Sequence, residues 1–228
     1  AALRTPRQVV WHLLSGLLLA SNWLLYVWAT LNGRILEGAL GYYLNPFFNM
    51  LFGFWWFGER HSLRQRAAIG LALAGVALQV PAVGSLPWVS LVLALTFSLY
   101  AVVKKQAPLP SRQGLTLETL LLAPLALGWL LHASHGGTAV MGSGPWQMAL
   151  ILASGAATTL PLVLFGHAAR RISLTTLGIL QFLGPTLQFG IGWWFYAEPM
   201  SVLRLASFGL IWLAIAVYAT ERGRVDER

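Results

Sequence analysis

Polar side chains on two proline-bearing apolar stretches are the residues of this chain best suited to bind a small molecule. Tyr42, Asn45 and Asn49 are spaced three and four apart, so they share one face of a helix. Gln181 and Gln188 are seven apart and also share a face. Amides exposed to lipid are costly, so both faces are expected to point inward. Hydrogen bonding between helices without any ligand is the alternative for each residue.

The prolines of these stretches, Pro46 and Pro185, predict a break in each helix. Proline donates no backbone hydrogen bond and crowds the carbonyl four residues earlier, here that of Tyr42 or Gln181. In hydrocarbon such a carbonyl needs a neighbouring helix or a watery cavity. Corresponding proline breaks in two halves of a chain therefore predict a substrate path.

Other polar positions deep in apolar stretches extend this predicted path. They are Asn22, Trp23, Tyr26 and Thr158. Glu118 has two interpretations. It is either a group inside the membrane that couples protons or binds a cation, or an acid near a helix N-terminus at the cytoplasmic interface. The second is favoured because Glu118 lies about one turn from the predicted helix end. Glu59 and Glu198 end their helices beside Arg60 and Arg204, which predicts salt bridges that lock the fold.

Enzyme and metal chemistry find no support in the sequence. The chain has no cysteine, and its five histidines lack HExxH spacing. It has no GxSxG elbow and no phosphate-cradling loop. We therefore predict neither a catalytic site, a metal site nor a cofactor.

The elements that must position these residues are membrane-spanning helices. Of the 228 residues, 57% are hydrophobic and only 10% are charged. A hydrocarbon core needs about 20 apolar residues per helix. Eight such stretches are predicted, at 9–29, 36–57, 67–80, 86–103, 115–131, 146–165, 174–196 and 202–220. Within them, Gly16 with Ala20 and Gly70 with Ala74 predict close helix packing.

The positions of the basic residues, which give the chain its net charge of +8, indicate how it is oriented in the membrane. Sorting the loops onto alternating sides of the membrane puts thirteen basic residues on one side, and only Arg34 and Arg204 on the other. Positive charge collects on the cytoplasmic side, so both ends of this chain are predicted to be cytoplasmic. Nucleic acid is not an expected partner.

An internal repeat organises the chain. Residues 44–77 align without a gap to residues 183–216 at an offset of 139, with ten identities that include Pro46 with Pro185 and Glu59 with Glu198. The aligned helices are the second and the seventh, and an offset of five spans reverses direction in the membrane. The repeats are therefore predicted to be inverted.

Counting spans predicts that the first repeat is incomplete. Residues 84–228 hold a whole repeat of five helices, whereas residues 1–83 hold only three. The chain also begins with Ala1 instead of Met. We expect an all-α polytopic membrane protein with eight helices of a ten-helix fold, whose first two helices are missing. A genuine eight-helix protein is the alternative.

Both proline-bearing stretches, GYYLNPFFNMLFGFWWFGER (41–60) and TLGILQFLGPTLQFGIGWWFYAE (176–198), resemble the paired signature helices of the EamA family, part of the drug/metabolite transporter superfamily. The likeness is strongest to its RarD-like branch. It is supported by NWLLYVWA (22–29), LTLETLLLAPLAL (115–127) and TTLPLVLFGHAARR (158–171), and it covers essentially the whole chain.

This resemblance implies an inner-membrane permease with two inverted five-helix EamA repeats around a cavity that opens alternately to each side. Small organic metabolites or drugs would be the substrates, with proton coupling as one option. The expected partners are the lipid bilayer and the small-molecule substrate, and a homodimer is left open. A non-transporting assembly or sensor subunit with the same fold is the alternative function. Without the first two helices, one wall of the cavity would be missing.

Overall fold

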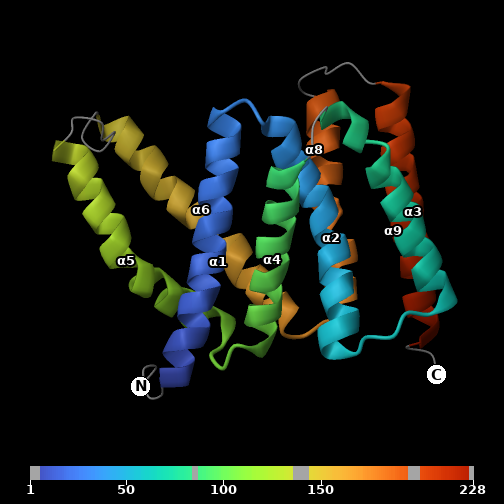
Figure 1. Ribbon diagram of the computed structural model, residues 1–228, viewed down its shortest axis with the longest axis horizontal. Coiled ribbons are helices and arrows are strands. Elements are labelled where there is room, and N and C mark those ends of the chain that lie inside the picture. Colours follow the sequence, from blue (N-terminus) through green and yellow to red (C-terminus); the bar gives the residue numbers. More distant parts are fainter. Residues whose placement is uncertain (1–5, 84–86, 136–143, 195–200, 226–228) are drawn as a thin grey trace. The chain divides into compact units, whose positions relative to one another are not determined.

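The computed structural model describes residues 6–83, 87–135, 144–194 and 201–225, and every regular element in these ranges is helical (Figure 1). The chain forms two compact units. Unit 1 holds residues 1–20 and 103–171, and unit 2 holds residues 21–102 and 172–228. The elements in chain order are α1 (Pro6–Leu31), α2 (Ile35–Phe57), α3 (Leu63–Ala77), the 3-10 helix η1 (Val80–Val83), α4 (Trp88–Gln106), α5 (Ser111–His135), α6 (Pro145–Ala169), α7 (Leu174–Gln181), α8 (Leu183–Trp194) and α9 (Val202–Val225).

Six helical stretches of the described residues are long and apolar enough to cross a membrane, where the sequence predicted eight. The six are Pro6–Leu31, Trp88–Gln106, Ser111–His135, Pro145–Ala169, Leu174–Ile191 and Val202–Thr220. The other two predicted spans form α2 and α3. Helix α2 has 23 residues but contains Glu37, Asn45 and Asn49, and α3 has only 15 residues. An all-helical, multi-pass membrane protein is confirmed at this coarser level.

The two prolines of the repeat occupy different helical positions. Pro46 lies inside α2, which continues through it. The predicted single helix at 174–196 is instead divided at Phe182, where α7 has ended and α8 begins with Leu183. Pro185 thus falls in the first turn of α8, where a backbone N–H would lack a helical partner in any case. The break expected in each proline-bearing stretch is therefore present between α7 and α8 and absent from α2.

Unit 2 is built around two close helix pairs. Helix α3 packs along α9, and the buried side chains of Ala72, Val76 and Ile211 belong to one hydrophobic core (Figure 1). The Ser207 hydroxyl donates to the Gly75 carbonyl at 2.7 Å and so fixes the register of this pair. Helix α2 packs on α7 with α8 following it, and the backbone of Pro46 lies close to α7 at Gly178, where a β-carbon would stand 2.8 Å from the Pro46 carbonyl oxygen.

Unit 1 combines the first half of α1, the end of α4, α5 and α6. Gly16 brings α1 close to α5, because a β-carbon there would stand 3.2 Å from Leu122 Cδ1. The close packing predicted at Gly16 is therefore present. The Ser111 hydroxyl donates to the Val163 carbonyl at 2.7 Å and links α5 to α6.

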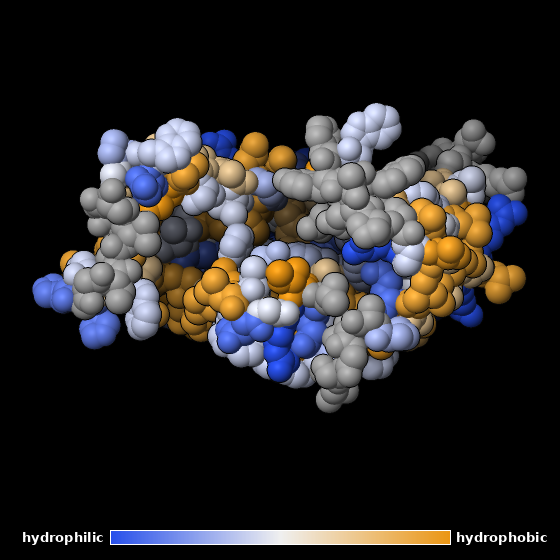
Figure 2. Space-filling view, turned by 90° about the horizontal axis from the view of Figure 1, so that it is seen from above, coloured by the Kyte–Doolittle hydropathy of each residue, from blue (hydrophilic) through white to orange (hydrophobic). Residues whose placement is uncertain are grey.

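Large apolar side chains remain on the outer surface of both units, in keeping with a surface that lipid covers. Leu24, Trp55, Leu125 and Leu152 each have at least 70% of their area exposed. The space-filling view shows such hydrophobic residues in broad patches on the outside of the helices (Figure 2). In water this exposure would be unfavourable, whereas hydrocarbon tails accommodate it.

Close packing in α3 occurs at Gly75 and not at the predicted Gly70. A β-carbon at Gly75 would lie 2.8 Å from the Ser207 carbonyl oxygen of α9, whereas one at Gly70 would have no atom within 4 Å. We predict that Gly75→Ala lowers the free energy of unfolding by about 1–3 kcal/mol through overpacking. Gly70→Ala, the control in the same helix, is expected to be neutral or slightly stabilising because alanine favours helix. Unfolding by SDS in mixed micelles measures both, and equal effects would contradict the packing assignment.

Candidate functional site

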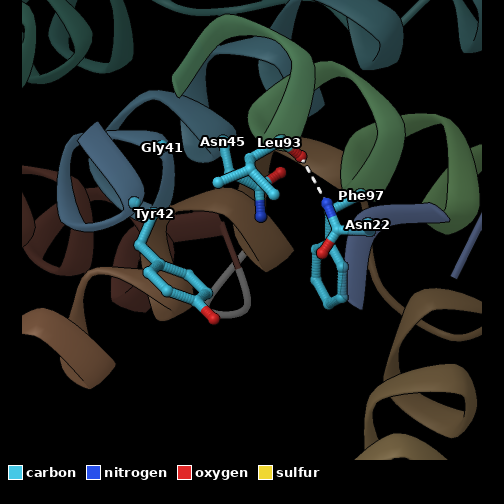
Figure 3. A pocket seen from close by; sticks show the side chains of 7 residues that line it. Asn22, Gly41, Tyr42, Asn45, Leu93 and Phe97 are labelled. Atoms are coloured by element: carbon cyan, nitrogen blue, oxygen red, sulfur yellow. Dashed lines mark hydrogen bonds between the residues drawn. The ribbon is translucent and has the colours of Figure 1, made fainter. Parts of the chain in front are cut away.

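A hollow in unit 2 lies between the second half of α1, α2 and α4 (Figure 3). Its volume is about 240 Å³, including space open at the mouth. The enclosed part has room for about one water molecule, so a small organic molecule requires a wider conformation. The hollow is lined by Asn22, Gly38, Gly41, Tyr42, Asn45, Leu93 and Phe97. Three of these residues, Asn22, Tyr42 and Asn45, belong to the predicted substrate path.

Helix contacts fix the polar groups around the hollow. The Asn22 side-chain amide donates to the Leu93 carbonyl at 2.8 Å and to the Thr96 hydroxyl at 2.8 Å, which joins α1 to α4. Gly41 allows α2 to approach α4, because a β-carbon there would stand 3.1 Å from Leu93 Cβ. In Figure 3 the amide nitrogen of Asn45 points into the space between Tyr42 and Asn22.

Three predicted aromatic residues contact one another in sequence, and one of them, Tyr42, lines the hollow. The Tyr42 side chain is 47% exposed. Its ring meets Tyr26 edge to face with 5.6 Å between centroids, and Tyr26 meets Trp23 in the same manner at 6.3 Å. Such pairs hold rings at fixed angles while leaving a face available for a planar ligand. The structure thus brings Trp23, Tyr26 and Tyr42 together.

Buried amides continue from the hollow along α2 to α7. Asn45 Oδ1 accepts a hydrogen bond from the Ser98 hydroxyl of α4 at 2.5 Å. Asn49 Nδ2 donates to Gln181 Oε1 of α7 at 2.5 Å, beside Pro46. These are hydrogen bonds between helices, which the sequence left open as the alternative to ligand binding. Whether the same amides contact a substrate stays a prediction.

The remaining predicted path residues lie elsewhere. Pro185 is buried in α8, whereas the side chain of Gln188 falls outside the described part of the chain. Thr158 is half-buried in α6 of unit 1, and its hydroxyl donates to the Ser154 carbonyl of its own helix at 2.5 Å. Thr158 therefore belongs to a different unit from the hollow.

Glu118 lies in a buried ionic cluster of unit 1. Its Oε1 atom is 2.9 Å from Lys104 Nζ and 3.1 Å from His12 Nδ1. Sequence reasoning assigned Lys104 to membrane topology and gave His12 no functional role. The two partners lie 14 and 106 positions from Glu118, so only the tertiary structure could join all three.

Glu59 caps the N-terminus of α7 and does not pair with Arg60, which is exposed. Its carboxylate accepts from the backbone N–H groups of Leu174 at 2.6 Å and Thr175 at 2.9 Å, and from the Thr175 hydroxyl at 2.7 Å. An anion at this end of a helix satisfies free donors and opposes the helix dipole. The predicted fold-locking role is thus supported through a cap instead of a salt bridge. Glu198 lies outside the described residues.

Two glycines make this cap possible, and one of them, Gly53, is matched in the repeat. Gly58 adopts φ 64° and reverses the chain at the end of α2, and the Glu59 N–H then bonds to the Gly53 carbonyl at 3.0 Å. A β-carbon at Gly53 would stand 2.5 Å from Glu59 Oε2. Gly53 and Glu59 are both matched in the second half of the repeat, whereas Gly58 aligns with Ala197.

The family comparison agrees with this all-helical, membrane-spanning architecture. Residues 2–80 match the EamA-like transporter family. A curated relative, an uncharacterized transporter of Pseudomonas aeruginosa, is 46% identical over 97% of this chain and 74% of its own length. Protein RarD of Escherichia coli is 37% identical over 96% of this chain and 74% of its length. A protein of solved crystal structure has the same fold, with TM-score 0.69 and 21% identity over 98% of this chain and 80% of that one.

These matches define a multi-pass membrane protein of a transporter class. The chain belongs to the EamA-like transporter family, in its RarD-like branch. Among the relatives, the Pseudomonas aeruginosa protein that is 29% identical is called chloramphenicol-sensitive protein RarD. Transport as the general function and the lipid bilayer as a partner follow from family membership.

Removal of the Glu59 charge tests the cap. Glu59→Gln leaves the α7 backbone donors with a weaker acceptor, so we predict a loss of about 1–2 kcal/mol in the free energy of unfolding. Arg60→Gln is the neighbouring control and is expected to change it by less than about 0.5 kcal/mol. Unfolding in mixed micelles measures both variants. A loss at Arg60 as large as that at Glu59 would restore the salt-bridge interpretation.

The loop histidine beside this cap predicts a pH effect. Burial lowers the pKa of His61 below 6.5, while the nearby Glu59 carboxylate acts in the opposite direction. The folded protein thus binds fewer protons at His61 than the unfolded chain does. The free energy of unfolding that this group contributes is fully present above pH 6.5 and decreases as the pH falls toward the lowered pKa. We predict that His61→Gln reduces the loss of stability between pH 7.5 and 5, measured by unfolding at each pH. An unchanged pH profile would contradict this assignment.

Proposed function

We propose that this protein is a secondary transporter that moves small organic molecules by alternating access, with the hollow of unit 2 as part of the substrate path. The observation that carries this proposal is a hollow lined by amides and aromatic rings in a chain of a transporter family. In a ten-helix plan, residues 84–228 would be one EamA repeat of five helices, and residues 1–83 would be three helices of the other, inverted repeat. An inner-membrane location with both ends of this chain cytoplasmic completes the proposal.

The lining favours an uncharged or zwitterionic planar molecule. Asn22 and Asn45 provide amides and Tyr42 a hydroxyl, while Phe97 and Leu93 provide apolar surface. None of the residues that line the described hollow is charged. A compound with an aromatic ring and a few hydrogen-bonding groups suits this chemistry, because rings stack and amides select orientation. Chloramphenicol is such a compound, and one relative is named for sensitivity to it.

Opening the path requires changes at the proline-bearing helices. In the present state the hollow is small, and the Asn49 to Gln181 hydrogen bond ties α2 to α7. The division between α7 and α8 at Phe182 lies next to that contact. A turn between two helices accommodates a change of angle more easily than a helix interior. We infer that α8 moves against α7 when the path opens, and that Pro46 and Pro185 mark the gate.

A flux assay tests the carrier function. The purified protein in liposomes would be offered labelled chloramphenicol, amino acids and nucleosides, with and without a proton gradient. We expect at least one solute to accumulate, and Tyr42→Ala to reduce its uptake about tenfold, which equals 1.4 kcal/mol. Trp56→Ala, at a residue 60% exposed in the same helix, is the matched control and should retain uptake.

The outcomes of the flux assay separate the two classes of function. Absence of flux for the whole panel under both conditions would count against a carrier and favour a non-transporting assembly or sensor subunit. Uptake by Tyr42→Ala that equals the retained uptake of Trp56→Ala would place Tyr42 outside the substrate path, while leaving transport itself intact.

A further inference from the structure

The ionic cluster of unit 1 is enclosed by protein. The exposed fractions of His12, Lys104 and Glu118 are 0%, 1% and 1%. Glu118 Oε1 is shared, at 2.9 Å from Lys104 Nζ and 3.1 Å from His12 Nδ1. Lys104 lies at the end of α4, and Glu118 is about 10 Å, or two turns, from the start of α5. Buried charges in a membrane protein are costly and rarely lack a function.

Two glycines shape the space that the cluster fills. A β-carbon at Gly114 would stand 2.8 Å from His12 Cε1 and 3.4 Å from Lys104 Nζ, so the bare α5 backbone admits both groups. On α6, a β-carbon at Gly166 would stand 2.9 Å from Lys104 Cε. Helices from four parts of the chain thus hold the histidine and the lysine against one carboxylate oxygen.

The charges of the cluster balance only while His12 is neutral. An ionised Glu118 cancels the charge of Lys104, and its Oε1 atom accepts hydrogen bonds from both neighbours. Nδ1 of His12 must then carry a proton, which leaves Nε2 as the basic nitrogen of a neutral ring. Nε2 has no hydrogen-bond partner among the described residues, and neither does Ser15 Oγ nor Glu118 Oε2. Buried polar atoms without partners are uncommon and mark positions where a further group binds.

Other charged groups in the described part of unit 1 bond elsewhere or are exposed. On α6, His167 contacts Arg171, and Arg170 donates to the Ala107 carbonyl at 2.6 Å. Lys105 donates to the Ala169 carbonyl at 3.3 Å. Arg7 of α1 and Arg112 of α5 are exposed. Glu118 and Lys104 are therefore the charged groups that face His12 from α5 and α4.

We propose that Nε2 of His12 is a proton-binding site, with Glu118 and Lys104 as a permanently charged pair that positions the ring. Imidazole is the side chain that ordinarily changes charge between pH 5 and 8. The proton comes from water on one side of the membrane and returns to water on the other, and only an N–H bond forms and breaks. The protonated cluster has a net charge of +1, which the enclosed site disfavours, so proton uptake favours a conformation that admits water.

This inference deepens the proposed function and rests on it for the link to solute movement. It differs from coupling at Glu118 itself, because protonation of that carboxylate would leave the ammonium of Lys104 buried without a countercharge. In this scheme Glu118 and Lys104 are positioning residues, and His12 is the group that gains and loses the proton.

Imidazole ¹⁵N NMR of the protein in lipid nanodiscs tests proton binding directly. With labelled histidine, the His12 signals should change from the neutral form with a proton on Nδ1 to the imidazolium form between pH 8.5 and 5. His12→Gln removes these signals, and His135→Gln, at an exposed histidine of α5, leaves them unchanged. If His12→Gln does not fold, variants of the other four histidines assign the spectrum by subtraction. A His12 ring that stays neutral throughout would overturn the proposal.

Flux measurements distinguish this proposal from the proposed function. If a solute is transported, the ratio of its uptake with a proton gradient to its uptake without one should fall to about one in His12→Gln. Exchange of labelled for unlabelled solute should continue in this variant. Undiminished stimulation would overturn the coupling role of His12 and leave the carrier function standing. If no solute moves but His12 still titrates, the carrier function fails and the proton site stands.

Discussion

A polar group enclosed among membrane helices must find its partner within the protein, and this constraint shapes both units. Hydrocarbon supplies no hydrogen bonds, so each buried amide, hydroxyl or charge either joins two helices or remains unsatisfied. In unit 2 the amides of Asn22, Asn45 and Asn49 join α1, α2, α4 and α7. In unit 1 the carboxylate of Glu118 joins α1, α4 and α5. The polar groups that suggest transport thus also hold the helices together.

Glycine determines where these polar contacts can form, because two helices must approach closely before short side chains can reach across. Gly41 brings α2 to α4 beside the hollow, and Gly114 brings His12 and Lys104 to the α5 backbone. Gly53 makes room for the Glu59 carboxylate that caps α7. Each substitution by alanine would act on a polar contact as well as on packing. Function and stability are therefore difficult to separate at these positions, and matched glycines with open surroundings, such as Gly70, are needed as controls.

The sequence predicts the local features of this molecule well and the contacts across it poorly. The length of the apolar stretches predicts the helices, and polar residues three and four positions apart predict the polar face of α2. Both features depend on residues that are close in the sequence. A break is expected at both prolines, but a proline alone does not show whether it lies inside a helix, as Pro46 does in α2, or in a first turn, as Pro185 does in α8. The Glu59 cap and the His12 to Glu118 contact link positions more than 100 residues apart. No spacing rule in a single sequence encodes such pairs.

Helices α1 and α4 offer a physical route by which proton binding could influence the hollow. Helix α1 contributes His12 to the ionic cluster and Asn22 to the hollow, and α4 contributes Lys104 to the first and Leu93 to the second. A helix transmits displacement along its axis because its backbone hydrogen bonds resist stretching. Coupling through shared helices requires no contact between a proton site and a substrate. It requires two arrangements of these helices, and both the proton and the substrate must bind one arrangement better than the other.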